Sequence, residues 1–169
     1  MDISRREAVT RLWGEHSAAL VLYAQQWCDT PEDVVQEAFL LLVRQGVAPD
    51  NPVGWMYRVV RNRAINASRS SGRRSRRETT AATRGEPWFE PASSERFDAA
   101  VAADALKHLP IEQREVIVAR LWGGLSFEEI ARLREMSLSK VYRNYRRGLV
   151  ALRERLDASC LTKNSKAKT

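Results

Sequence analysis

The side chains best suited to a chemical task lie in a basic stretch between positions 140 and 153, which contains no acidic residue. On a helix, Lys140, Arg143 and Arg147 recur at three- and four-residue spacing and so share one face. Arginine can pair bidentately with guanine in the major groove, and lysine can neutralise phosphates. A solvated helix face is the alternative explanation, but surface helices normally mix charges of both signs. The pattern therefore favours contact with DNA.

The opposite side of the same helix carries an apolar stripe that can pack on a core. The stripe consists of Val141, Tyr145, Leu149, Leu152 and Leu156. Asn144 and Arg146 are expected at the edges of the basic face, where an asparagine can pair with adenine. A helix divided in this way is suited to lie in a major groove.

Two helix-start signals define a pair of short-spaced helices, the second of which carries this basic face. Ser126 and Glu129 fit a capping box, and Ser137 can cap the next helix. These signals leave three residues between the two helices, the length that a DNA-binding helix-turn-helix needs. Glu135 stands in the middle of the turn, where a positive φ costs a non-glycine residue on the order of 1–2 kcal/mol.

Charge is distributed unevenly along the 169 residues, which carry 28 basic and 21 acidic side chains and a net charge of +7. Residues 1–40 contain three arginines and seven acids, residues 61–84 eight arginines and one acid, and residues 120–155 nine basic residues and four acids. This balance favours a nucleic acid as partner, with a membrane surface second; a basic protein without a polyanionic partner is the remaining alternative. The acidic front and two basic blocks indicate more than one kind of partner surface.

The residues expected of an enzyme or a metal site are missing from the sequence. His16 and His108 are isolated, and no nucleophile elbow, phosphate-binding loop or metal-ligand cluster occurs. Cys28 and Cys160 are far apart and have no metal-like spacing, which favours a reducing compartment. The N-terminal residues lack the apolar core of a signal peptide, and no apolar run approaches the roughly 18 residues that span a bilayer. We therefore expect a cytoplasmic protein that is not an enzyme, with no cofactor, no metal and no membrane insertion.

Apolar periodicity predicts helices along nearly the whole chain and no strands. Thr30-Pro31 and Asn51-Pro52 are helix starts, because Thr and Asn can cap a helix and Pro is harmless in its first turn. The helices are expected over about 9–27, 31–46, 52–69, 97–108, 111–122, 126–134 and 138–157.

The stretch 79–96 is rich in Thr, Ala, Ser, Gly, Pro and Glu and has no apolar period, which predicts a flexible linker. Its Trp88-Phe89 pair either docks elsewhere or folds back on its own domain. The polar, basic tail at 159–169 is predicted to be disordered. The sequence thus predicts an all-α protein of two small helical domains joined by a flexible linker.

Three sequence blocks are more specific than the helix-turn-helix alone. They read TPEDVVQEAFLLLVR (30–44), NPVGWMYRVVRNRAINASRSSGRRSRRE (51–78) and LPIEQREVIVARLWGGLSFEEIA (109–131). In this order and spacing they resemble an extracytoplasmic-function (ECF) sigma factor of bacterial RNA polymerase, over about residues 5–78 and 97–157.

The resemblance implies a domain organisation and a function. The implied domains are sigma region two over 1–78, a linker over 79–96, sigma region four with its helix-turn-helix over 97–158, and the tail. Such a protein binds core RNA polymerase and directs promoter-specific transcription initiation by recognising the −10 and −35 elements.

The resemblance also gives roles to individual residues. The clamp of the largest polymerase subunit would contact Asp33, Gln36 and Glu37. The −10 element would be melted and read by Arg58, Arg61, Asn62, Arg63 and Arg69, with Asn62 lining the pocket for a flipped-out base. The −35 element would be read by Tyr142, Arg143, Arg146 and Arg147, to which the charge pattern adds Lys140. Trp55 or Tyr57 can support or stack on bases, with core packing as the alternative for each and the favoured role for Trp55.

Two positions depart from the family pattern. Family members often have Leu-Gly at the turn and Gly-Thr at the start of the recognition helix, whereas this chain has Arg134-Glu135 and Ser139-Lys140. The −35 sequence preference of the family therefore does not transfer to this chain.

The expected partners are core RNA polymerase, through the clamp and the flap region, promoter DNA, and an anti-sigma factor able to wedge between the two modules. Two other protein classes stay open. One is a free-standing helix-turn-helix repressor or activator that never contacts polymerase. The other is an RNA-binding or anti-sigma-like adaptor whose Arg-rich segment grips RNA.

Overall fold

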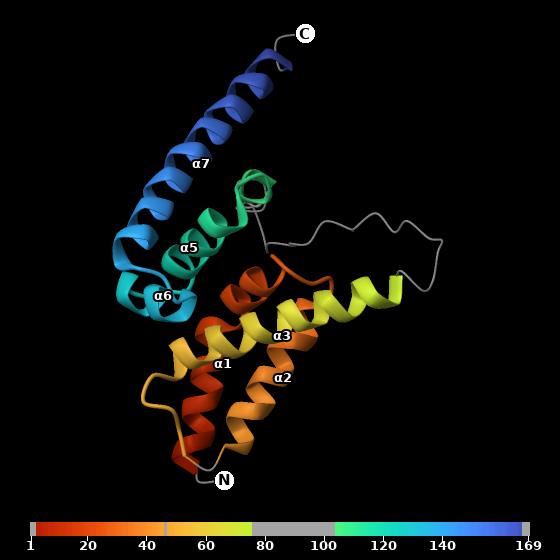
Figure 1. The fold of residues 1–169 in the computed structure, drawn as a ribbon, viewed down its shortest axis with the longest axis vertical. Coiled ribbons are helices and arrows are strands. Elements are labelled where there is room, and N and C mark those ends of the chain that lie inside the picture. The colour runs from red at the N-terminus through yellow and green to blue at the C-terminus, as the bar shows by residue number, and fades with distance from the viewer. Residues whose placement is uncertain (1–2, 46, 76–103, 167–169) are drawn as a thin grey trace.

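The computed structural model describes residues 3–45, 47–75 and 104–166, and all regular structure within them is helical (Figure 1). The helices are α1 (Ile3–Ala24), α2 (Pro31–Arg44), α3 (Pro52–Ser75), α5 (Ile111–Leu121), α6 (Phe127–Arg134) and α7 (Leu138–Lys166), with a further helical stretch at 104–107. The prediction of an all-α fold is confirmed. The predicted linker at 79–96, with its Trp88-Phe89 pair, lies outside the described residues.

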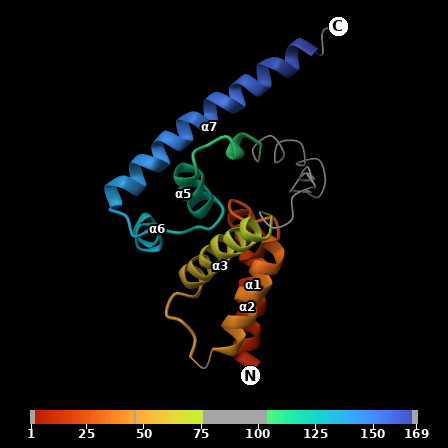
Figure 2. The same ribbon diagram turned by 45° about the vertical axis from the view of Figure 1, so that its right-hand side comes forward.

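Helices α1, α2 and α3 form a first helical group and pack against one another (Figure 2). Their packing buries Leu20, Tyr23, Val35, Phe39, Met56 and Val60. Apolar residues recur along α2 at three- and four-residue spacing, so one side of this helix faces the core and its carboxylates stay on the outer side.

The two proline-marked helix starts differ in their capping. Asn51 caps α3, because its Oδ1 accepts a hydrogen bond from the Gly54 N–H at 2.8 Å. Thr30 precedes Pro31 at the start of α2, but its side chain makes no capping hydrogen bond. Its backbone, at φ −124° and ψ 60°, lies outside the extended region that N-cap residues normally adopt. The predicted Thr30 cap is therefore wrong, although the helix begins where the sequence indicates.

Helices α5, α6 and α7 form a second helical group. The predicted capping box at the start of α6 is confirmed: Ser126 Oγ accepts from the Glu129 N–H at 3.1 Å, and Glu129 Oε2 accepts from the Ser126 N–H at 2.7 Å. Gly148 lies within α7, where glycine costs a helix about 1 kcal/mol. A Cβ at this position would lie 2.6 Å from Ile117 Cδ1, so the glycine permits the close approach of α7 to α5.

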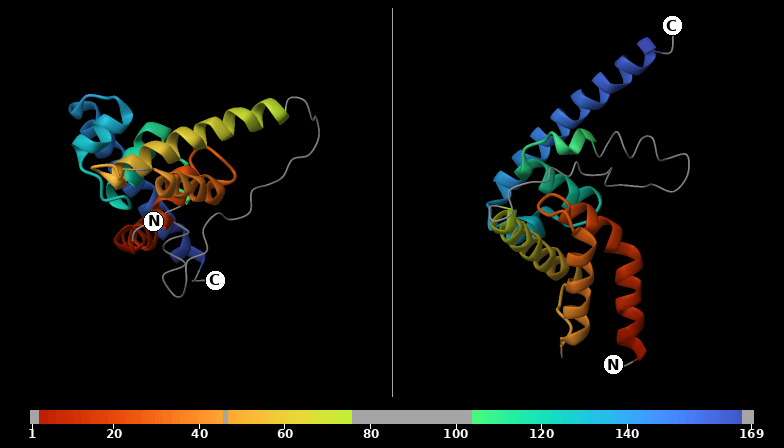
Figure 3. Two further views of the ribbon diagram at one scale, coloured as in Figure 1. Left: turned by 90° about the horizontal axis from the view of Figure 1, so that it is seen from below. Right: turned by 90° about the vertical axis from the view of Figure 1, so that its right-hand side faces the viewer.

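Helix α7 extends to Lys166, well beyond the end near residue 157 that apolar periodicity predicts. No proline or glycine interrupts it after Gly148, so nothing local stops its backbone hydrogen bonding. Residues 159–166 are therefore helical rather than disordered, and only 167–169 of the predicted tail lie outside the described residues. The C-terminal part of α7 projects away from the other helices (Figure 3).

The two helical groups pack against each other, which the expectation of two tethered modules did not include (Figure 1). Helix α1 contacts α5, helix α3 contacts α6, and buried residues of both groups form one continuous core. At one contact Tyr57 of α3 lies against Gly123, where a Cβ would sit 2.5 Å from the Tyr57 hydroxyl oxygen. The loop between α5 and α6 can approach α3 this closely because Gly123 has no side chain.

The caps give a direct test of this local structure. Replacing Ser126 with Ala removes the acceptor for the Glu129 N–H, so we expect a loss of about 1 kcal/mol in the free energy of unfolding. Thr30→Ala is the matched control and should change it by less than about 0.5 kcal/mol, because Thr30 is exposed and makes no capping bond. Urea denaturation of the full chain measures both, and equal losses would contradict this account.

Candidate nucleic-acid interface

The outer face of α7 presents most of the side chains predicted to read the −35 element. Tyr142, Arg143, Arg146 and Arg147 are exposed and line one side of the helix. Lys140, near the start of the helix, is less exposed than these four residues and is half-buried. The Tyr142 ring stands edge-on to Phe127 of α6, with ring centroids 5.4 Å apart. This contact fixes the tyrosine on the flank of the basic face.

An open groove of about 830 Å³ follows this face. Its apolar lining consists of Phe127, Leu138, Tyr142, Val150 and Ala151, and its polar lining of Ser139, Arg143, Arg146, Arg147, Glu128 and Glu154. Val150 leaves 59% of its surface exposed and Tyr142 50%. The groove thus combines guanidinium groups, which pair with phosphates and guanine, with apolar surface of the kind that contacts thymine methyl groups.

The turn before α7 has the geometry of a helix-turn-helix. Residues 135–137 separate α6 from α7, as predicted. Glu135 adopts φ 51° and ψ 46°, and among the described residues it is the one non-glycine residue with positive φ. The Met136 N–H donates to the Ala131 carbonyl at 3.0 Å and closes the end of α6. Ser137 then caps α7, since its Oγ accepts from the Lys140 N–H at 3.3 Å.

Asn144 does not lie at the edge of the basic face. It is buried, because α5 and α6 both pack against α7 and widen the covered side of this helix. Helical periodicity alone could not show how wide that side is. An adenine contact through Asn144 is therefore not available in this conformation.

The predicted −10 residues on α3 separate into two sets. Arg58, Asn62 and Arg69 are exposed. Arg63 forms an ion pair with Glu37 of α2, and Arg61 is held by a residue of α5. In this arrangement only part of the predicted strand-binding face is presented to solvent.

Neither aromatic residue suggested for base stacking stands free on α3. Tyr57 is fully buried, and burial raises the pKa of its hydroxyl. Trp55 is half-buried and packs against the core, in the role that the sequence favoured for it. Base stacking by Tyr57 would require the second helical group to move away.

The acidic face of α2 is formed as predicted. Asp33, Gln36 and Glu37 are all exposed on the side turned away from the core. Leu40 continues this face and leaves 53% of its surface exposed. The surface therefore offers carboxylates beside an apolar side chain, a combination suited to binding a basic protein partner.

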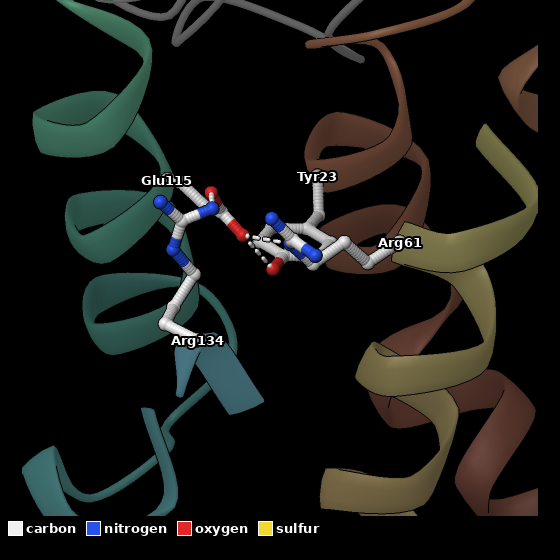
Figure 4. Close-up of polar contacts among 4 residues, drawn as sticks. All are labelled: Tyr23, Arg61, Glu115 and Arg134. Atoms are coloured by element: carbon white, nitrogen blue, oxygen red, sulfur yellow. Dashed lines mark hydrogen bonds and ion pairs between the residues drawn. The ribbon is translucent and has the colours of Figure 1, made fainter. Parts of the chain in front are cut away.

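Sequence reasoning missed Glu115 of α5, a charged residue whose side chain has no exposed surface (Figure 4). Its Oε1 accepts hydrogen bonds from the Tyr23 hydroxyl at 2.6 Å and from Arg61 Nε at 2.8 Å. Its Oε2 accepts from Arg134, the last residue of α6. Burial and the adjacent Glu115 carboxylate together raise the pKa of Tyr23 well above its usual range, so this hydroxyl stays protonated and donates. Residues from α1, α3 and α6 thus converge on one carboxylate.

One signal in the sequence could have indicated this site. Glu115 directly precedes the apolar run from Val116 to Ala119, which is too continuous for a helix with one solvated side. A helix buried on several sides covers its charged residues too, and a buried carboxylate needs cationic partners. The partners themselves lie 19, 54 and 92 positions away, beyond any local pattern.

Two kinds of feature are absent from the part of the chain that the structure describes. No helix there is both long enough and apolar enough to cross a membrane. No group of three or more His, Cys, Asp or Glu side chains lies close enough together there to hold a metal ion.

Comparison with known proteins finds relatives of this chain in both sequence and structure. The family profile described as "Sigma-70, region 4" matches residues 100–152, which include α5, α6 and the first half of α7. The ECF RNA polymerase sigma factors SigK of Mycobacterium bovis and Mycobacterium tuberculosis are each 30% identical over 139 residues, covering 76% of this chain and 73% of theirs.

Two solved structures share the fold. The sigma factor RpoE from Bartonella quintana, solved in complex with the anti-sigma factor NepR, matches with a TM-score of 0.71 at 21% identity, over 90% of this chain and 98% of that one. CnrH, solved in complex with the cytosolic domain of CnrY, matches with a TM-score of 0.60 at 24% identity, over 90% of each chain.

The basic helix-turn-helix and the family profile define a DNA-binding transcription factor of the sigma-70 class. The chain belongs to the ECF sigma factors of RNA polymerase. It therefore binds core RNA polymerase and directs promoter-specific transcription initiation. A free-standing regulator and an RNA-binding adaptor, the two other classes left open by the residues, are thereby set aside.

The strained turn provides a test of the helix-turn-helix geometry. Glu135→Gly should raise the free energy of unfolding by about 1 kcal/mol, because glycine adopts positive φ without a steric penalty. Glu135→Ala is the control: it removes the same carboxylate but keeps the strained Cβ, and should bring no such gain. If both variants stabilised the protein equally in urea denaturation, charge rather than backbone strain would be the cause.

Proposed function

We propose that residues 1–78 act as sigma region two and residues 97–158 as sigma region four, joined by the linker at 79–96. In this assignment α3 serves the −10 element and α7 serves the −35 element. The observation that carries the proposal is the exposed basic face of α7 behind a three-residue turn, within the stretch matched by the region 4 profile.

Arg143, Arg146 and Arg147 bind the −35 element in the major groove, with Tyr142 on the flank against sugars and Lys140 on phosphates. Their guanidinium groups are exposed along one groove and can form bidentate contacts to guanine or neutralise the backbone. The exposed apolar side chains of Val150 and Leu138, which line the same groove, add contacts to base methyl groups.

The α3 helix reads and holds the −10 element as a separated strand. Arg58 and Arg69 follow the backbone, and Asn62 lines the pocket for a flipped base; all three are already exposed. Arg61 and Arg63 join them once their present carboxylate partners release them.

The acidic face of α2 binds core polymerase. Asp33, Gln36 and Glu37 lie together on its outer side and meet the clamp of the largest subunit, while the second helical group meets the flap region. An anti-sigma factor is a further partner, since the structural neighbour RpoE was solved with the anti-sigma factor NepR. The protein works in the cytoplasm and catalyses no reaction itself.

Promoter recognition by α7 is tested by multi-round transcription with core enzyme and the promoter mapped from transcription start sites. Arg143→Ala and Arg147→Ala should each lower promoter binding by roughly 5- to 150-fold, the loss expected for one bidentate base contact. Arg153→Ala is the control on the same helix: it removes the same charge outside the groove and should have little effect. Full promoter-specific transcription by both groove variants would refute the proposed −35 role.

Polymerase binding by α2 is tested by pull-down of core enzyme. Asp33→Lys reverses a charge at the N-terminal end of the acidic face and should weaken binding by tenfold or more, because like charges opposed across an interface are costly. Glu7→Lys makes the same charge change at an exposed position of α1 and serves as the control. Equal retention of core enzyme by both variants would place the polymerase contact elsewhere.

A further inference from the structure

We propose that Glu115 is a latch that closes the second helical group over the −10 face of α3, and that Arg61 exchanges this carboxylate for a DNA phosphate when the protein opens on the separated −10 strand. The inference rests on the proposed role of α3. It adds a competition for the Arg61 guanidinium, which cannot pair with the Glu115 carboxylate and with a promoter phosphate at the same time.

The latch spans the boundary between the two helical groups (Figure 4). Glu115 lies on α5, whereas Tyr23 and Arg61 reach it from α1 and α3 at 2.6 and 2.8 Å. The Arg61 side chain is 24% exposed and its guanidinium carbon stands 5.8 Å from the centre of the Trp27 ring. Arg61 is therefore half-withdrawn from solvent but lies at the edge of the interface, where an incoming anion can reach it.

The chemistry of the two acceptors makes the exchange feasible. Carboxylate and phosphate oxygens both accept short, charge-assisted hydrogen bonds from arginine. A fully buried carboxylate that loses one cationic partner is destabilised, because its desolvation penalty is no longer offset. Opening the interface lets water reach Glu115 and removes that penalty. Loss of Arg61 to DNA thus favours separation of the two groups.

Arg134 explains why the closed state tolerates a buried charge. It forms the second ion pair of Glu115 from within the same helical group and remains with it after opening. Arg134 is one of the residues at which the turn departs from the family pattern, and its side chain is only 9% exposed. The departure therefore supplies the internal counter-ion of the latch.

Two further contacts close the same interface. Asn51, which caps α3, donates from its Nδ2 to Glu129, which belongs to the capping box of α6. Tyr57 fits against Gly123 in the loop before α6. The closed arrangement therefore covers Arg61 and Tyr57 together, while Arg58 and Asn62 remain exposed on the rest of α3.

The experiment compares two full-length latch variants with a control. Glu115→Gln removes the charge that holds Arg61, and Tyr23→Phe removes one hydrogen-bond donor while leaving the carboxylate and both arginines. Glu112→Gln is the control, because it removes the same charge from an exposed position of α5. None of these residues is among those assigned to promoter DNA or to the polymerase clamp.

Small-angle scattering measures the radius of gyration, fluorescence anisotropy measures binding of a single-stranded −10 oligonucleotide, and circular dichroism checks that each variant is folded. We expect Glu115→Gln to increase the radius of gyration and to tighten oligonucleotide binding roughly fivefold or more, since binding no longer has to open the latch. Tyr23→Phe should shift both readouts in the same direction by less, and Glu112→Gln should leave both unchanged.

Unchanged compactness and unchanged strand binding in a folded Glu115→Gln or Tyr23→Phe variant would overturn the latch. If Glu115→Gln proved unfolded, Tyr23→Phe alone would decide, because it keeps the charge balance of the site. Arg61→Ala separates this failure from a failure of the proposed function. If Arg61→Ala weakens strand binding while the latch variants do nothing, the −10 role stands and the latch falls. If the latch variants open the protein but neither they nor Arg61→Ala alter strand binding, Arg61 has no −10 role and the competition is wrong.

Discussion

The arrangement of the two helical groups depends on one electrostatic constraint, the burial of the Glu115 carboxylate. A carboxylate withdrawn from water is tolerated only where cations and hydrogen-bond donors replace its hydration. Here those donors come from α1, α3 and α6, so the constraint can be met only when the two groups are packed together. Apolar packing at the same boundary favours close contact between the two groups in many orientations, whereas the Glu115 carboxylate favours the one orientation in which its donors reach it.

Much of the local structure was predictable because its causes lie within a few residues. The Ser126 capping box, the Ser137 cap and the three-residue turn follow from short-range hydrogen bonds, and all are present. The exposed arginines of α7 follow from the 3.6-residue period. Thr30 shows where this reasoning ends: its residue type suits a cap, but its backbone, at φ −124° and ψ 60°, is not in the extended conformation of an N-cap residue.

The features that sequence could not supply depend on which helices meet. Asn144 is buried because two helices, rather than one, cover α7. Arg61 belongs by its helix face to the basic surface of α3, yet its partner stands 54 positions further along the chain. The end of α7 escaped prediction for a different reason, since a helix can continue without any apolar period when nothing breaks its backbone bonding.

Arg134 joins the latch to the recognition turn, and this has a consequence for how the two promoter elements are sensed. The residue is the last of α6, and Glu135, with its left-handed backbone, follows it directly. In the assignment proposed above, a change in the turn on binding the −35 element would displace a counter-ion of Glu115, and release of Arg61 would alter the charge environment of the turn. Thermodynamic linkage makes such coupling reciprocal. If binding of one promoter element changes the affinity for the other by some factor, binding of the second changes the affinity for the first by the same factor. Under the proposed assignment, binding of the two promoter elements would therefore be thermodynamically coupled through Glu115.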